Sequence, residues 1–303
     1  MFDHDDTGTV HAGPSDVPPH HGVPPVRPHV AVWSWLAIGV VFALLGTLLL
    51  VKVVGGTDSP VTALAPTSPQ VFGEVTGVPA WVANDVGVNS PTVPVHPPSV
   101  VANPLLTTTL VAHTQPLPEV LYFGTEFCSF CAAERWPLIV ALSRFGHFDQ
   151  LFDMQSSLVD YAPGTQTFSF WGTTYTSRYI VFRPFEVQSD VVGPHGFKPL
   201  MAVPAKLHAV LARFDPTSTY PFVDVANRVV LRQASLSPET LAGLTRNQIA
   251  ARLADPTSAV TQAILVAANE LTASICRVDS EQPRAVCNSI GVLSADAVLR
   301  HSR

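Results

Sequence analysis

The stretch EVLYFGTEFCSFCAAERWPLIVALSRFG, residues 119–146, decides the fold and the chemistry of this chain. It opens with the compact apolar run EVLYFG, which is typical of a buried strand. Cys128 and Cys131 follow, and apolar residues then recur at helical spacing up to Gly146, the expected helix stop. Pro137 falls inside this helix and is expected to kink it. The stretch therefore predicts a strand that leads through a Cys-x-x-Cys pair into a kinked helix.

The position of the pair at a helix N-terminus predicts different chemistry for the two sulfurs. Backbone N–H groups and the positive end of the helix dipole stabilise a thiolate at Cys128. Cys131 lies one turn further into the helix and is expected to be shielded. Thiol–disulfide exchange needs this asymmetry, because one thiolate attacks a disulfide and a second sulfur resolves the mixed intermediate. We therefore predict Cys128 as the nucleophile and Cys131 as the resolving thiol.

Two other interpretations of the pair stay open. Zinc sites use the same spacing but need two further ligands, and the other two cysteines, Cys276 and Cys287, lie far along the chain. A structural disulfide between Cys128 and Cys131 would close a very small loop and stabilise little. We therefore favour a reactive pair, and expect neither a metal nor a cofactor. Cys276 and Cys287 close a longer loop and are interpreted as a structural disulfide.

A second informative stretch is AVWSWLAIGVVFALLGTLLLV, residues 31–51, which has no charge and no proline. It is long enough to cross about 30 Å of hydrocarbon, and too long for the apolar part of a cleaved signal peptide. We predict a transmembrane helix over 30–54. Residues 1–29 are rich in Pro, Gly, Asp and His and are predicted to be a disordered tail. Residues 55–70 are predicted to be a Pro/Ser/Thr linker.

The compartment is inferred from the cysteines. All four follow the predicted span, and an even number suits an oxidising compartment. We therefore expect a single-pass cell-membrane protein with a cytoplasmic N-terminus and an extracytoplasmic C-terminal domain. Flanking charge does not fix the orientation, because Arg27 lies on one side of the span and Lys52 on the other. The net charge of −6, without a basic block, gives nucleic-acid binding no electrostatic basis.

The remainder, residues 71–299, predicts a layered α/β domain. Residues 152–160 predict a second strand, and an aromatic, β-branched segment around Gly172 predicts an extended excursion or hairpin. Two short apolar runs around Ala226 and Asn227 predict an antiparallel hairpin.

The last third of the chain is predicted to be helical. Ser237 is the expected cap of one helix, because Pro238 and an acidic residue follow it. Residues 245–248 fit a capping box. Asp255 and Pro256 are expected to open a long helix that contains Cys276 near its end.

These motifs together resemble the thioredoxin-like superfamily. The segment TEFCSFC is similar to the acid–aromatic–Cys-x-x-Cys segment of that superfamily, through Glu126 and Phe127. The resemblance also implies a cis-proline opposite the cysteines at the start of a hairpin strand. Pro221 has the expected order and context. Such a proline exposes the backbone of the preceding residue, Tyr220, to a bound substrate strand. Tyr220 and Pro221 are therefore the expected substrate-docking residues.

Two departures from the superfamily concern proton handling and redox poise. Thioredoxin itself has a buried acid six residues before the first cysteine, where this chain has Tyr122. Glu119 and Glu126 are candidate substitutes, and we group Tyr122, Glu126 and Phe127 as supporting residues. The pair Ser129-Phe130 between the cysteines matches neither the reductants nor the strong oxidants of the superfamily. The direction of the redox reaction is therefore left unassigned.

One branch resembles the chain more closely over residues 71–299. It is an uncharacterised family, catalogued as a domain of unknown function, whose members often carry an N-terminal membrane anchor. The resemblance implies a thioredoxin-like α/β fold, a central mixed sheet with flanking helices, insertions and a helical C-terminal extension. It favours a membrane-anchored oxidoreductase that acts on protein thiols and disulfides and exchanges electrons with a membrane redox partner. The alternative is a non-enzymatic binding or scaffold module with structural disulfides.

Overall fold

The computed structural model describes residues 38–43, 64–88, 94–101, 103–108 and 115–301. The chain separates into two compact units, residues 1–60 and 61–303. All the helices and strands named below belong to the second unit.

The predicted tail, membrane helix and linker fall largely outside the described residues. Within the predicted span, residues 38–43 are described and are helical. The linker prediction is covered only from residue 64 onward. There the carbonyl of Ala65 accepts a hydrogen bond from the Asp153 N–H at 2.8 Å, and the Thr67 N–H donates to Leu151 at 2.8 Å. Contacts with the folded domain therefore begin a few residues before residue 71.

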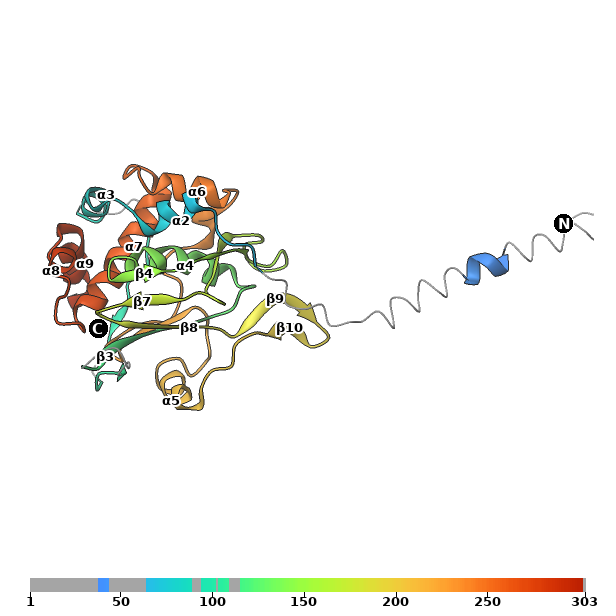
Figure 1. The fold of residues 1–303 in the computed structure, drawn as a ribbon, viewed down its shortest axis with the longest axis horizontal. Helices are drawn as coiled ribbons and strands as arrows, with labels where there is room; N and C mark the ends of the chain where they lie inside the picture. The colour runs from blue at the N-terminus through green and yellow to red at the C-terminus, as the bar shows by residue number, and fades with distance from the viewer. Residues whose placement is uncertain (1–37, 44–63, 89–93, 102, 109–114, 302–303) are drawn as a thin grey trace, which may run out of the picture. The chain divides into compact units, whose positions relative to one another are not determined.

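The second unit is a mixed α/β structure (Figure 1). Its strands are β1 (Ser99–Val100), β2 (Thr107–Thr108), β3 (Leu117–Gly124), β4 (Gly146–Phe148), β5 (Phe152–Gln155), β6 (Gln166–Ser169), β7 (Tyr175–Ser177), β8 (Val181–Glu186), β9 (Gln188–Gly193), β10 (Gly196–Pro199), β11 (Phe222–Val225) and β12 (Val229–Leu231). Its helices are α2 (Pro69–Thr76), α3 (Ala80–Asp85), α4 (Ser129–Leu142), α5 (Ala205–Phe214), the 3₁₀ turn η1 (Pro238–Leu241), α6 (Arg246–Arg252), α7 (Ala259–Cys276), α8 (Arg284–Cys287) and α9 (Ile290–His301).

The central sheet is built around β3. Its order is β1–β12–β11–β3–β2, and β8 also pairs with β3. The β3–β8 pair is parallel, whereas β11 runs antiparallel to both β3 and β12. A parallel pair requires a crossover, and α4 provides part of it between β3 and β8. The central mixed sheet expected from the sequence is therefore present.

Helices cover both faces of this sheet, with α4 and α7 on one side and α5 on the other (Figure 1). Successive side chains of a strand point to opposite faces. Val120 and Tyr122 accordingly pack in the core formed with α4 and α7, whereas Leu121 and Phe123 pack with α5. Because neither face meets water, β3 is a continuous apolar run rather than an alternating one.

Helix α7 is the central helix of the core. Among the described residues it alone is long and apolar enough to cross a membrane, but 89% of that window is buried inside the domain. The helix begins at Ala259, with Ser258 as N-cap, and not at Asp255 as the sequence suggested. The reason is local, since Asp255 Oδ1 accepts hydrogen bonds from both the N–H and the hydroxyl of Thr257 and holds the chain in a turn.

Three further expectations need correction. The strand predicted over 152–160 ends at Gln155 and pairs with β6 in a separate two-stranded sheet, and a loop follows it. Gly146 is not the end of α4, which stops at Leu142. It begins β4, where an added Cβ would collide with the carbonyl of Thr176 in β7. The helix expected after Ser237 is only the single 3₁₀ turn η1.

Two short-range predictions, the β11–β12 turn and the capping box at Thr245, are confirmed. Ala226 and Asn227 join β11 to β12 with positive φ angles of 52° and 60°. Thr245 and Gln248 form both hydrogen bonds of a capping box at the start of α6. Pro137 lies inside α4. These patterns succeed because each depends on atoms within a few residues of one another.

Candidate functional site

Cys128 is the N-cap of α4. The chain leaves β3 at Gly124, and Cys128 keeps an extended conformation before the helix starts at Ser129. Its sulfur accepts a hydrogen bond from the Cys131 N–H at 3.1 Å. The Cys128 thiol is 9% exposed and that of Cys131 is completely buried. The structure therefore shows the unequal access that the sequence predicted for the pair.

The two thiols also differ in acidity. The pKa of Cys128 is lowered, first by the hydrogen bond to the Cys131 side chain, then by the backbone N–H of Cys131 and the positive charge of Arg135; burial and Asp160 oppose this shift. Burial raises the pKa of Cys131 well above its usual range, and interaction with Cys128 adds to that rise. Of the pair, Cys128 is therefore the sulfur that ionises first.

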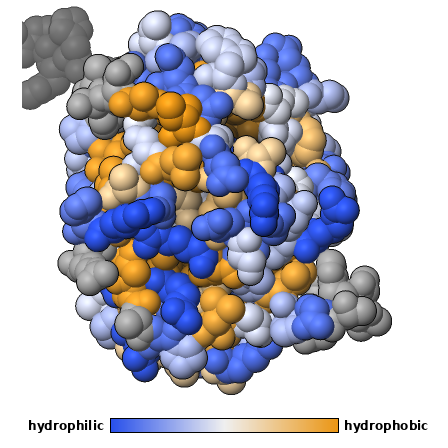
Figure 2. Space-filling view, turned by 90° about the vertical axis from the view of Figure 1, so that its left-hand side faces the viewer, coloured by the Kyte–Doolittle hydropathy of each residue, from blue (hydrophilic) through white to orange (hydrophobic). Residues whose placement is uncertain are grey.

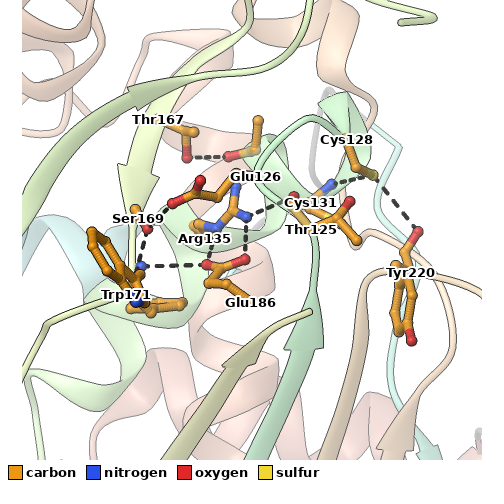
Figure 3. Close-up of polar contacts among 12 residues, drawn as sticks. Thr125, Glu126, Cys128, Cys131, Arg135, Thr167, Ser169, Trp171, Glu186 and Tyr220 are labelled. Carbon is orange, nitrogen blue, oxygen red and sulfur yellow. Dashed lines mark hydrogen bonds and ion pairs between the residues drawn. The ribbon is translucent and has the colours of Figure 1, made fainter. Parts of the chain in front are cut away.

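The expected docking residues lie beside this sulfur. Pro221 immediately precedes β11, the neighbour of β3, and the Tyr220–Pro221 peptide bond is cis. The carbonyl oxygen of Tyr220 lies 3.9 Å from Cys128 Sγ (Figure 3). Segments about ninety positions apart in the chain thus meet at the one partly accessible thiol.

A buried ion pair lies beneath the cysteines. The guanidinium of Arg135 donates from Nε to Glu186 Oε1 at 2.9 Å and from Nη2 to Glu186 Oε2 at 2.7 Å (Figure 3). Nη2 also donates to the carbonyl of Thr125 at 2.8 Å. Both side chains are completely buried. Arg135 thereby connects helix α4, the end of β8 and the turn that leads to Cys128.

This ion pair was not predicted from the sequence, although the spacing of Arg135 from Cys131 indicates that Arg135 lies near the cysteines. Arg135 follows Cys131 by four residues, so the two share one face of α4. Adjacent charged residues such as Glu134 and Arg135 are typical of a solvated or ion-paired helix face. Arg135 is ion-paired, but neither residue is solvated. Glu134 is buried and accepts hydrogen bonds from the N–H of Ser235 at 2.6 Å and from its hydroxyl at 3.2 Å.

Polar atoms without partners gather around Arg135. Among the described residues, Tyr122 Oη, Thr125 Oγ1, Glu126 Oε2 and Arg135 Nη1 are buried and make no hydrogen bond. The other carboxyl oxygen of Glu126 accepts from Ser169 at 2.6 Å (Figure 3). Burial raises the pKa of Glu126 to about 7. Unsatisfied polar groups are costly in a core, so their concentration around Arg135 needs an explanation.

The three sequence candidates for proton handling differ in burial and in acidity. Tyr122, at the position of the superfamily's buried acid, is completely buried, and burial raises its pKa well above the usual value. It cannot accept a thiol proton as an ionised base. Glu126 titrates near neutral pH and is the better acceptor on that ground. Glu119 is also buried, near Arg183 of β8, with 3.6 Å between Oε2 and Nη1.

Aromatic and acidic residues surround the thiol. Phe127 stacks on Phe197 of the β9–β10 hairpin, with 4.0 Å between ring centroids. Phe130 stacks on Tyr161 at 5.2 Å. The loop that carries Tyr161 is fixed to the helix start, because Asp160 Oδ2 accepts the Ser129 N–H at 2.5 Å. The sequence had assigned this loop to a strand, so its role at the site was not foreseen.

The second cysteine pair is a disulfide, as expected. Cys276, at the end of α7, is bonded to Cys287 in α8, with 5.7 Å between Cα atoms. Among the described residues, the only metal-type ligand group is Cys276, Asp279 and Cys287. Both of its sulfurs are already bonded to each other. Where the structure describes the chain, no free set of ligands fits a structural zinc site.

Comparison with protein families gives one match. Residues 110–192 match the family model of a domain of unknown function, DUF929. The resemblance to an uncharacterised family is thus confirmed, over a shorter stretch than residues 71–299. The matched range contains Cys128, Cys131 and the Arg135–Glu186 ion pair, but neither Pro221 nor the disulfide. No curated protein and no solved structure is significantly similar to the chain.

Proposed function

We propose that this protein is a membrane-anchored thiol–disulfide oxidoreductase of the thioredoxin-like superfamily, acting on extracytoplasmic proteins through Cys128 and Cys131. The observation that carries the proposal is the position of Cys128. Its sulfur caps a helix, accepts a backbone N–H, has a lowered pKa and lies 3.9 Å from the Tyr220 carbonyl. A purely structural thiol needs none of these features.

The proposed reaction transfers two electrons from the cysteine pair to the substrate disulfide. The Cys128 thiolate attacks one sulfur of a substrate disulfide, forms a mixed disulfide and releases the other substrate sulfur as a thiolate. Cys131 then loses its proton and attacks the Cys128 sulfur. The Cys128–Cys131 disulfide forms and the second substrate thiolate leaves. The dithiol is oxidised, the substrate disulfide is reduced, and the protons of both thiols end on the two substrate sulfurs. Oxidation of a client dithiol is the same sequence in reverse.

The surrounding groups support this sequence. The raised pKa of Cys131 keeps it protonated until the mixed disulfide forms and the neighbouring Cys128 charge is gone. Glu126 and the polar atoms around Arg135 supply a nearby route for its proton. The backbone oxygen of Tyr220 accepts a long hydrogen bond from the Cys128 thiol. After that thiol ionises, the oxygen can accept a hydrogen bond from an extended substrate strand instead.

Three other parts of the proposal rest on different observations. The superfamily assignment is supported by the elements named in the resemblance: strand β3, the Cys-x-x-Cys pair, the Pro137-containing helix α4, and Pro221 at the start of the β11–β12 hairpin. Membrane anchoring is supported by the uncharged sequence of residues 31–51. Extracytoplasmic exposure is supported by the Cys276–Cys287 disulfide, because such bonds persist in oxidising compartments.

Disulfide exchange assays test the proposal directly. The full-length protein is assayed for reduction of insulin disulfides and for oxidation of a dithiol peptide, beside Cys128→Ser. We expect activity in at least one direction, and its loss in the variant. Equal rates in the two proteins would remove the case for catalysis.

Redox titration separates the proposal from the scaffold alternative. The midpoint potential of the Cys128–Cys131 pair is measured against glutathione or dithiothreitol buffers. A value below about −300 mV is typical of structural disulfides and would favour a binding module with an inert pair. We expect a higher value, because the Cys128 thiolate is stabilised in the reduced form.

A further inference from the structure

A cavity of about 380 Å³ lies between α7, α9 and the segment before β1. Its walls are apolar side chains from these three parts, among them Val95, Val266 and Ala295. Val298 also lines it and is 45% exposed, so the cavity reaches the surface. Figure 2 views the molecule from the side on which α3 and α9 lie, and shows hydrophobic patches between polar residues there. The volume suits a compact ligand of one ring or a short chain.

One lining residue is a carboxylic acid with an unpaired oxygen atom. Glu270 is the only charged residue of α7 and is 3% exposed. Its Oε2 atom is fully enclosed and makes no hydrogen bond with any residue the structure describes. Burial raises the pKa of Glu270 to about 7. A carboxyl group enclosed in apolar walls is costly unless a donor reaches it.

The remaining polar side chains of the cavity are already used. Asn269 donates to the carbonyls of Ala83 and Val86 at 2.9 and 3.1 Å and accepts from Arg144 at 2.8 Å. Ser294 donates to the carbonyl of Gly87 at 2.7 Å. These bonds connect the residues that line the cavity, and none of them involves the carboxyl group of Glu270. A molecule that enters the cavity can supply the missing donor.

The charged groups near Glu270 indicate which kind of ligand would donate a hydrogen bond to it. No basic side chain is among the described residues that line the cavity. The charge of Glu270 acts on another buried acid, Glu134 of α4, whose pKa is raised to about 8 by burial, with a smaller contribution from Glu270. The cation behind the wall, Arg144, donates hydrogen bonds to Asn269 and Thr272. An anion would be repelled here, and a neutral donor would leave the charge uncompensated. A cation that also donates hydrogen bonds satisfies both requirements.

We propose that this cavity binds a small apolar molecule that carries one primary ammonium group, which donates to the Glu270 carboxylate while the apolar part fills the space between α7 and α9. Glu270 is the specificity-determining residue of the site. The inference does not depend on the chemistry of the cysteines.

Benzylamine is a suitable probe, and benzyl alcohol of the same shape is its uncharged counterpart. Binding to the full-length protein in detergent is measured by titration calorimetry and saturation-transfer NMR, with protein-free micelles as the blank. We expect millimolar or tighter binding of benzylamine and about tenfold weaker binding of benzyl alcohol. Absence of benzylamine binding in the millimolar range would overturn the proposal, as would equal affinity for the alcohol.

Two variants locate the binding. Glu270→Gln keeps the size of the side chain and removes its charge, and is expected to weaken benzylamine binding about tenfold. Ala295→Leu fills the cavity with added carbon atoms and is expected to abolish binding. Glu281→Gln removes an exposed carboxylate that does not line this cavity and is the matched control. Circular dichroism verifies folding, and unchanged affinity in the folded Glu270→Gln variant would sink the assignment.

Discussion

The two cysteine pairs of this protein differ in bonding and in surroundings. Cys276 and Cys287 are both nearly buried, stand in two adjacent helices and are bonded to each other. Cys128 and Cys131 lie within one helix start, differ in exposure, and have pKa values shifted in opposite directions. The first pair joins two elements, whereas the second pair is polarised by its surroundings. The difference shows that environment, more than spacing, gives a cysteine pair its role.

The residues around the two cysteine pairs also differ. The disulfide adjoins the apolar contacts of α7, α8 and α9 and a single acid, Asp279, whose pKa burial raises to about 6. The Cys128–Cys131 pair adjoins a buried ion pair, an acid with a pKa of about 7 and several unsatisfied polar atoms. A core seldom accumulates such groups, because each costs stability unless it is compensated. Their presence next to Cys131 is therefore consistent with a chemical role, and each can be altered separately.

The largest expected effect comes from removing the cation beneath the reactive pair. Arg135→Met leaves Glu186 buried without its partner and is expected to lower the free energy of unfolding by about 3–5 kcal/mol. It should also raise the pKa of Cys128, because Arg135 lowers that pKa. Chemical denaturation measures the first effect, and the pH dependence of thiolate absorbance measures the second.

A double variant and a surface variant separate these effects. Arg135→Met combined with Glu186→Leu removes both charges and should recover much of the lost stability, yet keep the raised Cys128 pKa. Arg178→Met, at an exposed arginine, should change neither quantity. An unaltered Cys128 pKa in the double variant would mean that Arg135 stabilises the fold without lowering that pKa. The electrostatic difference between the two cysteine pairs would then have another cause.

The next effect concerns the disulfide. Replacing Cys276 and Cys287 together by Ser should lower the free energy of unfolding by about 3 kcal/mol, because the unfolded chain regains the freedom of the closed loop. Disulfide exchange by the folded variant should stay near that of the unaltered protein. Denaturation and an insulin assay below the unfolding midpoint provide the two measurements. Loss of exchange with the fold intact would instead make the second pair an electron relay for the first.

A smaller effect is a pH dependence centred on α4. Glu134 ionises near its ordinary value of 4.5 when unfolded, but burial raises its pKa to about 8 in the fold. Between these values the folded state binds more protons, so the free energy of unfolding should fall as pH rises from about 5 to 8. The slope for one group is at most about 1.4 kcal/mol per pH unit. Denaturation midpoints across that range should show the decline.

The matched variants for this pH dependence are both glutamate to glutamine. Glu134→Gln should flatten the decline, whereas Glu281→Gln, at an exposed position, should leave it unchanged. A decline that persists in full in Glu134→Gln would mean that other buried acids, such as Glu126, carry the extra protons.

How far the sequence could predict the structure depended on the range of each interaction. The thiol pair, its helix start and the β11–β12 turn were foreseen, because each is encoded within a few residues. The Arg135–Glu186 pair joins residues 51 positions apart, and nothing in the local sequence around Glu186 announces it. The start of α7 was predicted at Asp255, four residues too early, because an aspartate in a turn and an aspartate at a helix cap have the same sequence pattern. The same ambiguity hid the loop that carries Asp160.

The smallest expected effect comes from changing Asp160, and it tests how the surroundings of Cys128 set the acidity of its thiol. Its carboxylate accepts the Ser129 N–H at 2.5 Å and raises the pKa of Cys128, against the larger influences that lower it. Asp160→Asn keeps an acceptor for that N–H but removes the charge, so the pKa of Cys128 should fall. Alkylation of Cys128 by iodoacetamide at mildly acidic pH should then become a few-fold faster, since a half-exposed charge changes energies by only about 1 kcal/mol or less. Asp149→Asn, at an exposed acid beside His147, is the control and should leave the rate unchanged. If Asp160→Asn instead slows alkylation, Asp160 acts mainly by orienting the helix start, and the acidity of Cys128 depends on hydrogen-bond geometry more than on charge.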